Sequence, residues 1–272
     1  MVTYLDRILE RHREVAATDR RPLDELVASA RAQGAARGFR RALANAERLA
    51  VISEVKRRSP SKGDLFPDLD PADLAARYET GGATCLSVLT DEEFFGGSVA
   101  DLQVARAACS LPVLRKDFTV SAHDVVDARI MGADAVLLIA AALDRSALGE
   151  LHGFAVELGL DVLVEVHDEP ELDVALEVGA TLVGVNQRDL ITFEVDHERA
   201  VRMAAAIPDD VVKVAESGVR GPADARALHA AGYHAVLVGE SLVTSGDPAA
   251  AVAALVGADV RDDDDGDIPN RS

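Results

Sequence analysis

Polar side chains close five separate apolar runs of this sequence, and their types suit acid–base chemistry. The runs are "LAVISEVK", "PVLRKDF", "DVLVEV", "LVGVNQ" and "VVKVAES", and the polar residues near their ends are Glu54, Lys56, Lys116, Glu165, Asn186 and Glu216. Lysine ammonium groups can donate protons, and glutamate carboxylates can accept them. A purely structural network of ion pairs is the alternative, because a buried charge is costly unless it is paired. A structural network would not require polar residues at the C-terminal ends of five different runs, so the pattern favours a catalytic site.

The use of lysine is informative. Lysine occurs only at Lys56, Lys62, Lys116 and Lys213, and every other base is arginine. The lysine ammonium is compact and can lose its proton when buried, whereas arginine stays charged. We expect Lys116, which is flanked by Lys56 and partly desolvated, to have a lowered pKa. Lys213 falls on the opposite face of its run from Glu216, which indicates a structural role, and Lys62 follows "SPS" in a loop that we expect to be solvated.

Eight short apolar runs rich in β-branched residues recur along the chain, with amphipathic helical patterns between them. The runs cover residues 49–56, 85–90, 112–118, 135–141, 161–166, 182–187, 211–217 and 235–240. Apolar strands that alternate with helices are typical of parallel sheets covered by helices. Eight such units favour an α/β fold with a closed (β/α)8 TIM barrel, and no G-x-G-x-x-G follows the first strand to indicate a dinucleotide fold. Active sites of these barrels lie at the C-terminal ends of the strands, where the polar residues occur.

We expect a single domain over residues 1–256, in which residues 1–48 form a helical extension. The pattern "RPLDELVASARAQ" indicates the clearest helix of this extension, which should pack on the barrel and cover one end. Residues 257–272, with the run "DVRDDDDGDIPNRS", are expected to form an acidic, disordered tail. The N-terminal segment lacks the apolar centre of a secretory signal, and no apolar run approaches the roughly 20 residues that span a bilayer.

The 272-residue chain carries a formal net charge of −19, which repels nucleic acid and anionic membranes. Neither is therefore an expected partner, and the scattered Asp and Glu indicate a surface of the kind found in a high-salt cytoplasm. The two cysteines, Cys85 and Cys109, indicate a reducing cytoplasm rather than a disulfide framework. The seven histidines lack metal-ligand spacing, so no metal is predicted. His167, one position out of phase with Glu165, is expected to be a loop or cap residue.

A phosphate site is indicated where the seventh and eighth predicted strands end. The chain reads "ESGV" and "GESL" there, and barrels of this fold often bind phosphate with these two loops. Gly218 and Gly239 allow backbone N–H groups to approach an anion closely. Ser59 follows the first strand, which neighbours the eighth in a closed ring, so its hydroxyl could complete the site. The pattern predicts a phosphorylated small molecule as the ligand.

Together these segments resemble one known family. "ISEVKRRSPSKGDL" is similar to the signature of indole-3-glycerol phosphate synthase, an enzyme of tryptophan biosynthesis. "VLRKDF", "LVEVHDEPEL", "GVNQRDL", "VAESGV" and "LVGESLV" follow in the family's order, so that the likeness spans roughly residues 40–245. The resemblance implies a (β/α)8 barrel with an N-terminal extension. It also implies that 1-(2-carboxyphenylamino)-1-deoxyribulose 5-phosphate is converted without a cofactor to indole-3-glycerol phosphate, carbon dioxide and water. We expect a monomer or a weak homo-oligomer.

The resemblance also implies residue roles. Lys116 matches the general acid that protonates the ribulose carbonyl, Lys56 the lysine that pairs with the substrate carboxylate, and Glu165 the residue that moves a proton in dehydration. Whether Lys56 or Glu165 is the acid in that last step stays open. Glu54 matches the glutamate that orients the lysines. The implied substrate-binding residues are Phe95, Arg58, Asn186, Arg188, Glu216 and Ser217, and the implied phosphate-binding residues are Ser59, Gly218, Gly239 and the amide of Glu240.

Two other functions suit a barrel of this kind. Phosphoribosylanthranilate isomerase, the neighbouring step, is expected to use a Cys and an Asp at strand ends. Here the first strand ends in Glu54 and Lys56, and both cysteines lie elsewhere. A barrel that binds a phosphorylated ligand without turnover would not need Lys56, Lys116 and Glu165. The residues therefore favour the synthase over both.

Overall fold

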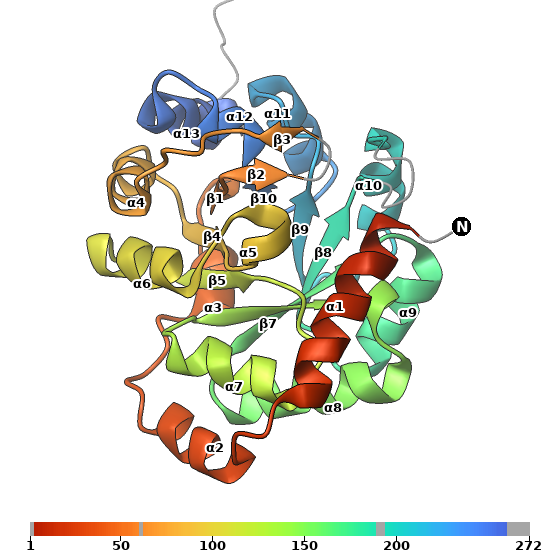
Figure 1. Cartoon of the computed structure of the whole chain (residues 1–272). Coiled ribbons are helices and arrows are strands. Elements are labelled where there is room, and N and C mark those ends of the chain that lie inside the picture. The colour runs from red at the N-terminus through yellow and green to blue at the C-terminus, as the bar shows by residue number, and fades with distance from the viewer. Residues whose placement is uncertain (1–2, 60–61, 189–193, 260–272) are drawn as a thin grey trace, which may run out of the picture.

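The computed structural model describes residues 3–59, 62–188 and 194–259. Eight parallel strands close into a barrel in the order β1–β10–β9–β8–β7–β6–β5–β4, with helices around them (Figure 1). Each of the eight predicted runs contains one strand, so the predicted (β/α)8 barrel is confirmed. The strands are β1 (Ala50–Val55), β4 (Cys85–Leu89), β5 (Val113–Lys116), β6 (Ala135–Ile139), β7 (Asp161–Val166), β8 (Leu182–Asn186), β9 (Val212–Glu216) and β10 (Ala235–Val238).

Helices follow the strands and cover the outside of the barrel. Most of them begin at an Asp or Ser whose side chain accepts a hydrogen bond from the first turn, as Asp70 does for α4. Those on the barrel are α4 (Pro71–Thr80), α5 (Glu92–Phe95), α6 (Val99–Ala108), α7 (Ala122–Ile130), α8 (Arg145–Glu157), α9 (Glu169–Glu177), α10 (His197–Ala204), α11 (Pro222–Ala230), α12 (Glu240–Val243) and α13 (Pro248–Val256). A 3-10 turn, η1 (Ala140–Ala142), follows β6, and a small hairpin of β2 (Arg58–Ser59) and β3 (Gly63–Asp64) follows β1.

The core has two layers, which the strand alternation separates. One set of strand residues, including Ile52, Leu114 and Leu163, packs inside the barrel. The alternate set, including Val51 and Val113, packs between the strands and the helices. Because side chains alternate along a strand, the inward set continues into the polar residues at the C-terminal ends. The phase predicted from the sequence is therefore confirmed.

The N-terminal extension consists of α1 (Tyr4–Thr18), α2 (Leu23–Arg31) and α3 (Phe39–Ala44), and it covers both ends of the barrel. Phe39 and Leu43 of α3 join the inner core, and the Phe39 carbonyl contacts Cys85 at the start of β4. Leu9 of α1 joins the same core, and Arg13 donates to the Ala142 carbonyl, which follows the C-terminal end of β6. The extension thus covers one end of the barrel, as predicted, and it also covers the other end, which the sequence did not indicate.

The first three residues of the predicted tail, 257–259, have regular structure. Gly257–Asp259 form a short 3-10 helix, η2, in which Ala258 is buried. Residues 260–272, which hold the acidic run, lie outside the described residues, so their expected disorder stays a prediction. Within the described ranges, no helix is both long and apolar enough to cross a membrane.

Candidate active site

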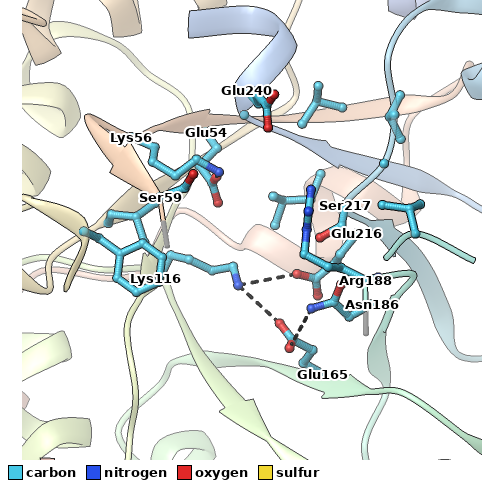
Figure 2. Close-up of a pocket in the computed structure, with 18 of the residues that line it drawn as sticks. Glu54, Lys56, Ser59, Lys116, Glu165, Asn186, Arg188, Glu216, Ser217 and Glu240 are labelled. Carbon is cyan, nitrogen blue, oxygen red and sulfur yellow. Dashed lines mark hydrogen bonds and ion pairs between the residues drawn. The ribbon is translucent and has the colours of Figure 1, made fainter. Parts of the chain in front are cut away.

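A cavity of about 810 Å³ lies at the C-terminal ends of the barrel strands. Its lining combines charged residues from opposite sides of the barrel, several of which point toward a common centre (Figure 2). The structure brings together all but one of the residues predicted for the site: Glu54, Lys56, Ser59, Phe95, Lys116, Glu165, Asn186, Arg188, Glu216, Ser217, Gly218, Gly239 and Glu240. The exception is Arg58.

Lys116 lies at the centre of the charged group. Its Nζ is 3.2 Å from Glu165 Oε2 and 3.6 Å from Glu216 Oε2, and its side chain is only 17% exposed. Desolvation favours the neutral amine, but the charges of Glu165, Glu216 and Glu54 outweigh it, so the pKa of Lys116 is raised. The expectation of a lowered pKa was wrong, because the nearest charges are carboxylates and not Lys56. Lys116 therefore rests as a protonated donor.

Glu165 and Glu216 face Lys116 from neighbouring parts of the ring but differ in their surroundings. Asn186 donates to Glu165 Oε1 at 3.0 Å. Burial alone would raise the pKa of Glu165, but Lys116, His167 and this hydrogen bond lower it. Burial and the charge of Glu165 raise the pKa of Glu216, against the opposing effect of Lys116, and its Oε1 has no hydrogen-bond partner among the described residues. One carboxyl is thus held ionised while its neighbour retains a proton more readily.

Glu54 and Lys56 form the second ion pair of the site. Glu54 Oε1 lies 2.6 Å from Lys56 Nζ, and the Ser87 hydroxyl donates to Glu54 Oε2 at 3.4 Å. A Cβ at Gly239 would overlap Glu54 Oε1 and approach Lys56 Nζ to 3.1 Å. The glycine predicted for phosphate binding therefore also leaves the room that this ion pair occupies.

The other part of the cavity shows features of an anion site. The Ser59 hydroxyl is buried and has no hydrogen-bond partner among the residues described. Ser217 has a φ of 65°, unusual for a residue with a Cβ, and Gly218 follows it with a φ of 76°. Lys62 lies at this edge, with Nζ 3.8 Å from Glu240 Oε1 and a side chain 57% exposed. Lys62 is solvated as predicted, but it also lines the cavity.

Arg58 lies beside the site rather than in its lining. Its Nη2 donates to the Glu92 and Glu93 carbonyls of α5 at 3.2 and 2.5 Å. Helix α5 carries Phe95, whose ring lies 6.1 Å from the Phe118 ring. In this structure Arg58 therefore positions an aromatic wall, and a direct binding role for it stays a prediction.

Helix α1 supplies a wall of the cavity that sequence reasoning missed. Tyr4, Leu5 and Ile8 line the cavity, although they lie far in sequence from the motifs. The helix is held by His12, whose Nε2 lies 3.0 Å from Asp91 Oδ2 and 3.8 Å from Asp117 Oδ1. The amphipathic pattern of α1 could have shown that one face is buried, but not against which end of the barrel.

The same three residues, His12, Asp91 and Asp117, have ligating atoms within 4.8 Å of one another, a spacing that could hold a metal ion. Their atoms are already engaged: Asp91 also accepts hydrogen bonds from the start of α5, and Asp117 accepts from Arg115 at 2.9 Å. We therefore interpret the cluster as the attachment of α1. The prediction that the protein uses no metal is not tested by the structure.

His167 is the second residue whose contacts the sequence did not reveal. Its backbone N–H and its Nδ1 contact Glu171 Oε2 at 2.8 and 3.1 Å, which agrees with the predicted cap role. Its Nε2, however, lies 3.6 Å from Glu165 Oε1. The strand alternation ends at Val166, where β7 ends, so phase no longer predicts the direction of the next side chain. Lys213, by contrast, binds the Ala204 carbonyl away from the cavity, as predicted.

Comparison with known proteins decides the family. A model of indole-3-glycerol phosphate synthase matches residues 5–255 of the chain. The chain belongs to the indole-3-glycerol phosphate synthase family. It is 56% identical to the synthase of a Nocardioides species over 209 aligned residues. The alignment covers 77% of this chain and 80% of that protein. The chain is 54% identical to the Leifsonia xyli subsp. xyli synthase, with 87% and 91% covered, and 51% identical to that of Mycolicibacterium gilvum, with 94% of each covered.

Membership of the synthase family confirms the resemblance seen in the motifs and makes the chain a carboxy-lyase of tryptophan biosynthesis. Solved structures with the same fold include thiamine phosphate pyrophosphorylase from Pyrococcus furiosus, with a TM-score of 0.58 at 16% identity, covering 77% of this chain and 95% of that one. Another is N-acetylmannosamine-6-phosphate 2-epimerase from Clostridium perfringens, with a TM-score of 0.57 at 13% identity, covering 71% and 86%. At these identities the likeness shows the barrel fold alone.

Gly184 lies below Glu216 in the floor of the synthase site, which leads to a prediction. A Cβ at this position would overlap Glu216 Oε1 and lie 3.2 Å from Leu163 Cδ1. We expect Gly184→Ala to displace the Glu216 carboxylate, and a misplacement of about 1 Å can lower kcat by about 10²-fold. Steady-state kinetics of the folded variant would measure this loss.

Gly153→Ala is the matched control, because a Cβ there meets nothing within 4 Å and the residue lies in helix α8. It should keep wild-type kinetics and gain about 0.5–1 kcal/mol of stability. Wild-type kcat in a correctly folded Gly184→Ala variant would show that the close approach of Glu216 is not required.

Proposed function

We propose that this cavity converts 1-(2-carboxyphenylamino)-1-deoxyribulose 5-phosphate to indole-3-glycerol phosphate, carbon dioxide and water, with the residue roles given below. Family membership supports the reaction and makes the substrate a phosphorylated small molecule. The observation that carries the roles is the Lys116 ammonium, held between the Glu165 and Glu216 carboxyl groups in the cavity. A substrate carbonyl oxygen bound in this cavity could accept a proton from this ammonium.

The substrate is oriented by its two ends. We assign the phosphate to Ser59, Gly218, Gly239 and the Glu240 amide, and the unpartnered Ser59 hydroxyl supports this choice because a buried hydroxyl is costly unless it is hydrogen-bonded. We assign the ring to Phe95, Asn186, Arg188, Glu216 and Ser217, of which Ser217 adjoins the phosphate residue Gly218. Tyr4, Leu5 and Ile8 of α1 add apolar surface there.

Ring closure is the step assigned to Lys116. The ring carbon that carries the carboxylate attacks the ribulose carbonyl carbon, and Lys116 gives a proton to the carbonyl oxygen, which becomes a hydroxyl. Loss of carbon dioxide then returns the bonding electrons to the ring. Lys56 pairs with the carboxylate before it leaves, and Glu54, 2.6 Å away, keeps the Lys56 ammonium in place.

Dehydration completes the indole. We assign Glu165 as the base that removes a proton from the carbon next to the one bearing the hydroxyl, because Lys116, Asn186 and His167 favour its ionised form. The hydroxyl leaves as water with a proton from Lys56. This choice between Lys56 and Glu165 as the acid follows from the charge state of Glu165, because an ionised carboxylate has no proton to give.

We further propose a cytoplasmic enzyme that acts as a monomer or weak homo-oligomer and binds neither nucleic acid nor membranes. Both cysteines are free thiols, which suits a reducing compartment. The net charge of −19 disfavours polyanionic partners and supports a surface adapted to high salt. Sedimentation at several salt concentrations would test the oligomeric state.

The direct test of the reaction is an assay with the purified chain and the named substrate. Indole-3-glycerol phosphate and carbon dioxide should form in equal amounts. Binding of the substrate without product would support a ligand-binding barrel, and isomerisation of phosphoribosylanthranilate would support the neighbouring step; either result would contradict the proposal.

The role of Lys116 predicts that Lys116→Arg nearly abolishes catalysis. Arginine keeps a cation between Glu165 and Glu216, but it does not release a proton and its planar group would misplace the donor. General acid catalysis is typically worth about 10²–10⁴ in rate, so kcat should fall by at least about 10².

Lys116→Met, which removes the charge as well, is the comparison, and binding of indole-3-glycerol phosphate checks that both variants keep the site. Loss of even the weakest general acid should leave only about a hundredth of the wild-type kcat. If Lys116→Arg keeps more than about a tenth, then Lys116 acts by charge alone.

The phosphate assignment predicts that Ser59→Ala raises KM more than it lowers kcat. One hydrogen bond to a charged group is worth about 1.5–3 kcal/mol, which corresponds to about tenfold or more in KM. Some loss of kcat is expected, because remote binding energy also orients the reacting atoms. A large fall in kcat at unchanged KM would place Ser59 near the reacting ring instead.

A further inference from the structure

The His167 ring lies between two carboxylates, one in the site and one outside it. Its Nδ1 is 3.1 Å from Glu171 Oε2 in the first turn of α9, and its Nε2 is 3.6 Å from Glu165 Oε1 at the end of β7. Nε2 is buried and has no hydrogen-bond partner within the described ranges. A buried polar nitrogen without a hydrogen bond costs free energy of folding, so a contact between Nε2 and a nearby acceptor would be stabilising.

The chemistry of the two neighbours determines what the ring must do. An ionised carboxylate only accepts hydrogen bonds, so each ring nitrogen that faces one is favoured as a donor. A ring with N–H groups at both nitrogens is an imidazolium. Burial and Arg199 oppose this charge, whereas Glu171 and Glu165 favour it and prevail, so the pKa of His167 is raised.

Glu165 is held from two sides. Lys116 Nζ contacts Oε2 at 3.2 Å, while Asn186 Nδ2 donates to Oε1 at 3.0 Å and His167 Nε2 faces the same oxygen. The distance of 3.6 Å is too long for a hydrogen bond, but catalytic hydrogen bonds are often long before substrate binds. A small shift of the carboxylate would complete the contact.

We propose that His167 is a positioning residue for Glu165: fixed by Glu171, its imidazolium presents Nε2–H to Glu165 Oε1 and keeps that carboxylate ionised and directed at the reacting atoms. This inference rests on the proposed role of Glu165 as the base in dehydration. His167 does not line the cavity and acts only through Glu165. Asn186 supplies a neutral hydrogen bond to the same oxygen, so the particular contribution of His167 is its charge.

The alternative is that His167 only caps α9 through Glu171. Two variants separate these roles: His167→Ala removes the ring contact to Glu171 but keeps the backbone N–H that also donates to Glu171, whereas Glu171→Ala removes both contacts. Only His167→Ala also removes the ring that faces Glu165. A cap role predicts a smaller loss of thermal stability in His167→Ala than in Glu171→Ala, and no change in the pH dependence of kcat.

The positioning role predicts a different result for His167→Ala. Without the positive ring, the pKa of Glu165 rises, so the acidic limb of the kcat–pH profile should move to higher pH. The kcat at neutral pH should fall by about tenfold or more, a part of the 10²–10⁴ that general acid–base catalysis supplies. Glu171→Ala should shift the limb less, because the ring stays. An acidic limb unmoved in His167→Ala would overturn the proposal.

Glu165→Gln separates failure of this inference from failure of the proposed function. If Glu165→Gln keeps more than about a tenth of the wild-type kcat, too much for loss of a general base, then Glu165 is not the base and the positioning role fails with it. If Glu165→Gln is inactive while His167→Ala keeps the wild-type acidic limb, only the positioning role fails.

A titration that does not depend on activity covers the case in which His167→Ala does not fold. The imidazole of His167 can be followed by nuclear magnetic resonance in the wild-type protein and in Glu165→Gln. The proposal predicts that His167 titrates at lower pH once the Glu165 charge is removed. An unchanged midpoint would show that the two groups are not coupled, and would overturn the proposal.

Discussion

The site depends on one constraint: three carboxyl groups and two ammonium groups lie together on side chains that are only 2–17% exposed. A buried charge costs several kcal/mol unless it is paired, so every member of the group needs the others. Lys116 lies within 4 Å of both Glu165 and Glu216, and Lys56 lies closest to Glu54. With three carboxyl groups and two ammonium groups, the net charge of the group is zero when one carboxyl keeps its proton. Glu216, whose pKa burial and Glu165 raise, is placed to do so.

The barrel meets this constraint by taking the five charges from four strand ends, of which only that of β1 supplies two, Glu54 and Lys56. In a closed ring of parallel strands, the last inward residues of β1, β5, β7, β8 and β9 all face one volume. No strand has to carry more than one charge pair, and apolar residues such as Ile52, Leu114, Leu163 and Val214 fill the barrel directly below that level. The unpartnered Ser59 hydroxyl and the turn at Ser217 and Gly218 line the same cavity but carry no charge that could join the ion pairs of Lys116 and Lys56. We infer that phosphate binding and proton transfer are carried by different residues.

Much of this arrangement could be predicted from the sequence. Strand alternation has a period of two, so apolar runs that end in Lys or Glu indicate which side chains point inward, and eight repeats indicate closure. Three features could not be predicted. The pKa of Lys116 depends on distances across the barrel, the placement of α1 depends on contacts such as that of His12 with Asp91, and the direction of His167 depends on where β7 ends. The first two features depend on residues that are distant in the chain, and the third depends on the point at which the regular strand ends. A single sequence motif reveals neither kind of cause.

We expect the charge group to hold one proton on Glu216 when no substrate is bound, because burial and Glu165 raise the pKa of that carboxyl. Nuclear magnetic resonance of protein labelled with ¹³C at the glutamate carboxyl carbon measures this directly, and Glu216→Gln assigns the signal. One glutamate should remain protonated well above the usual glutamate pKa of about 4.3, and its signal should be missing in Glu216→Gln. If instead every buried glutamate is ionised at a pH near that usual value, the proposed charge balance is wrong.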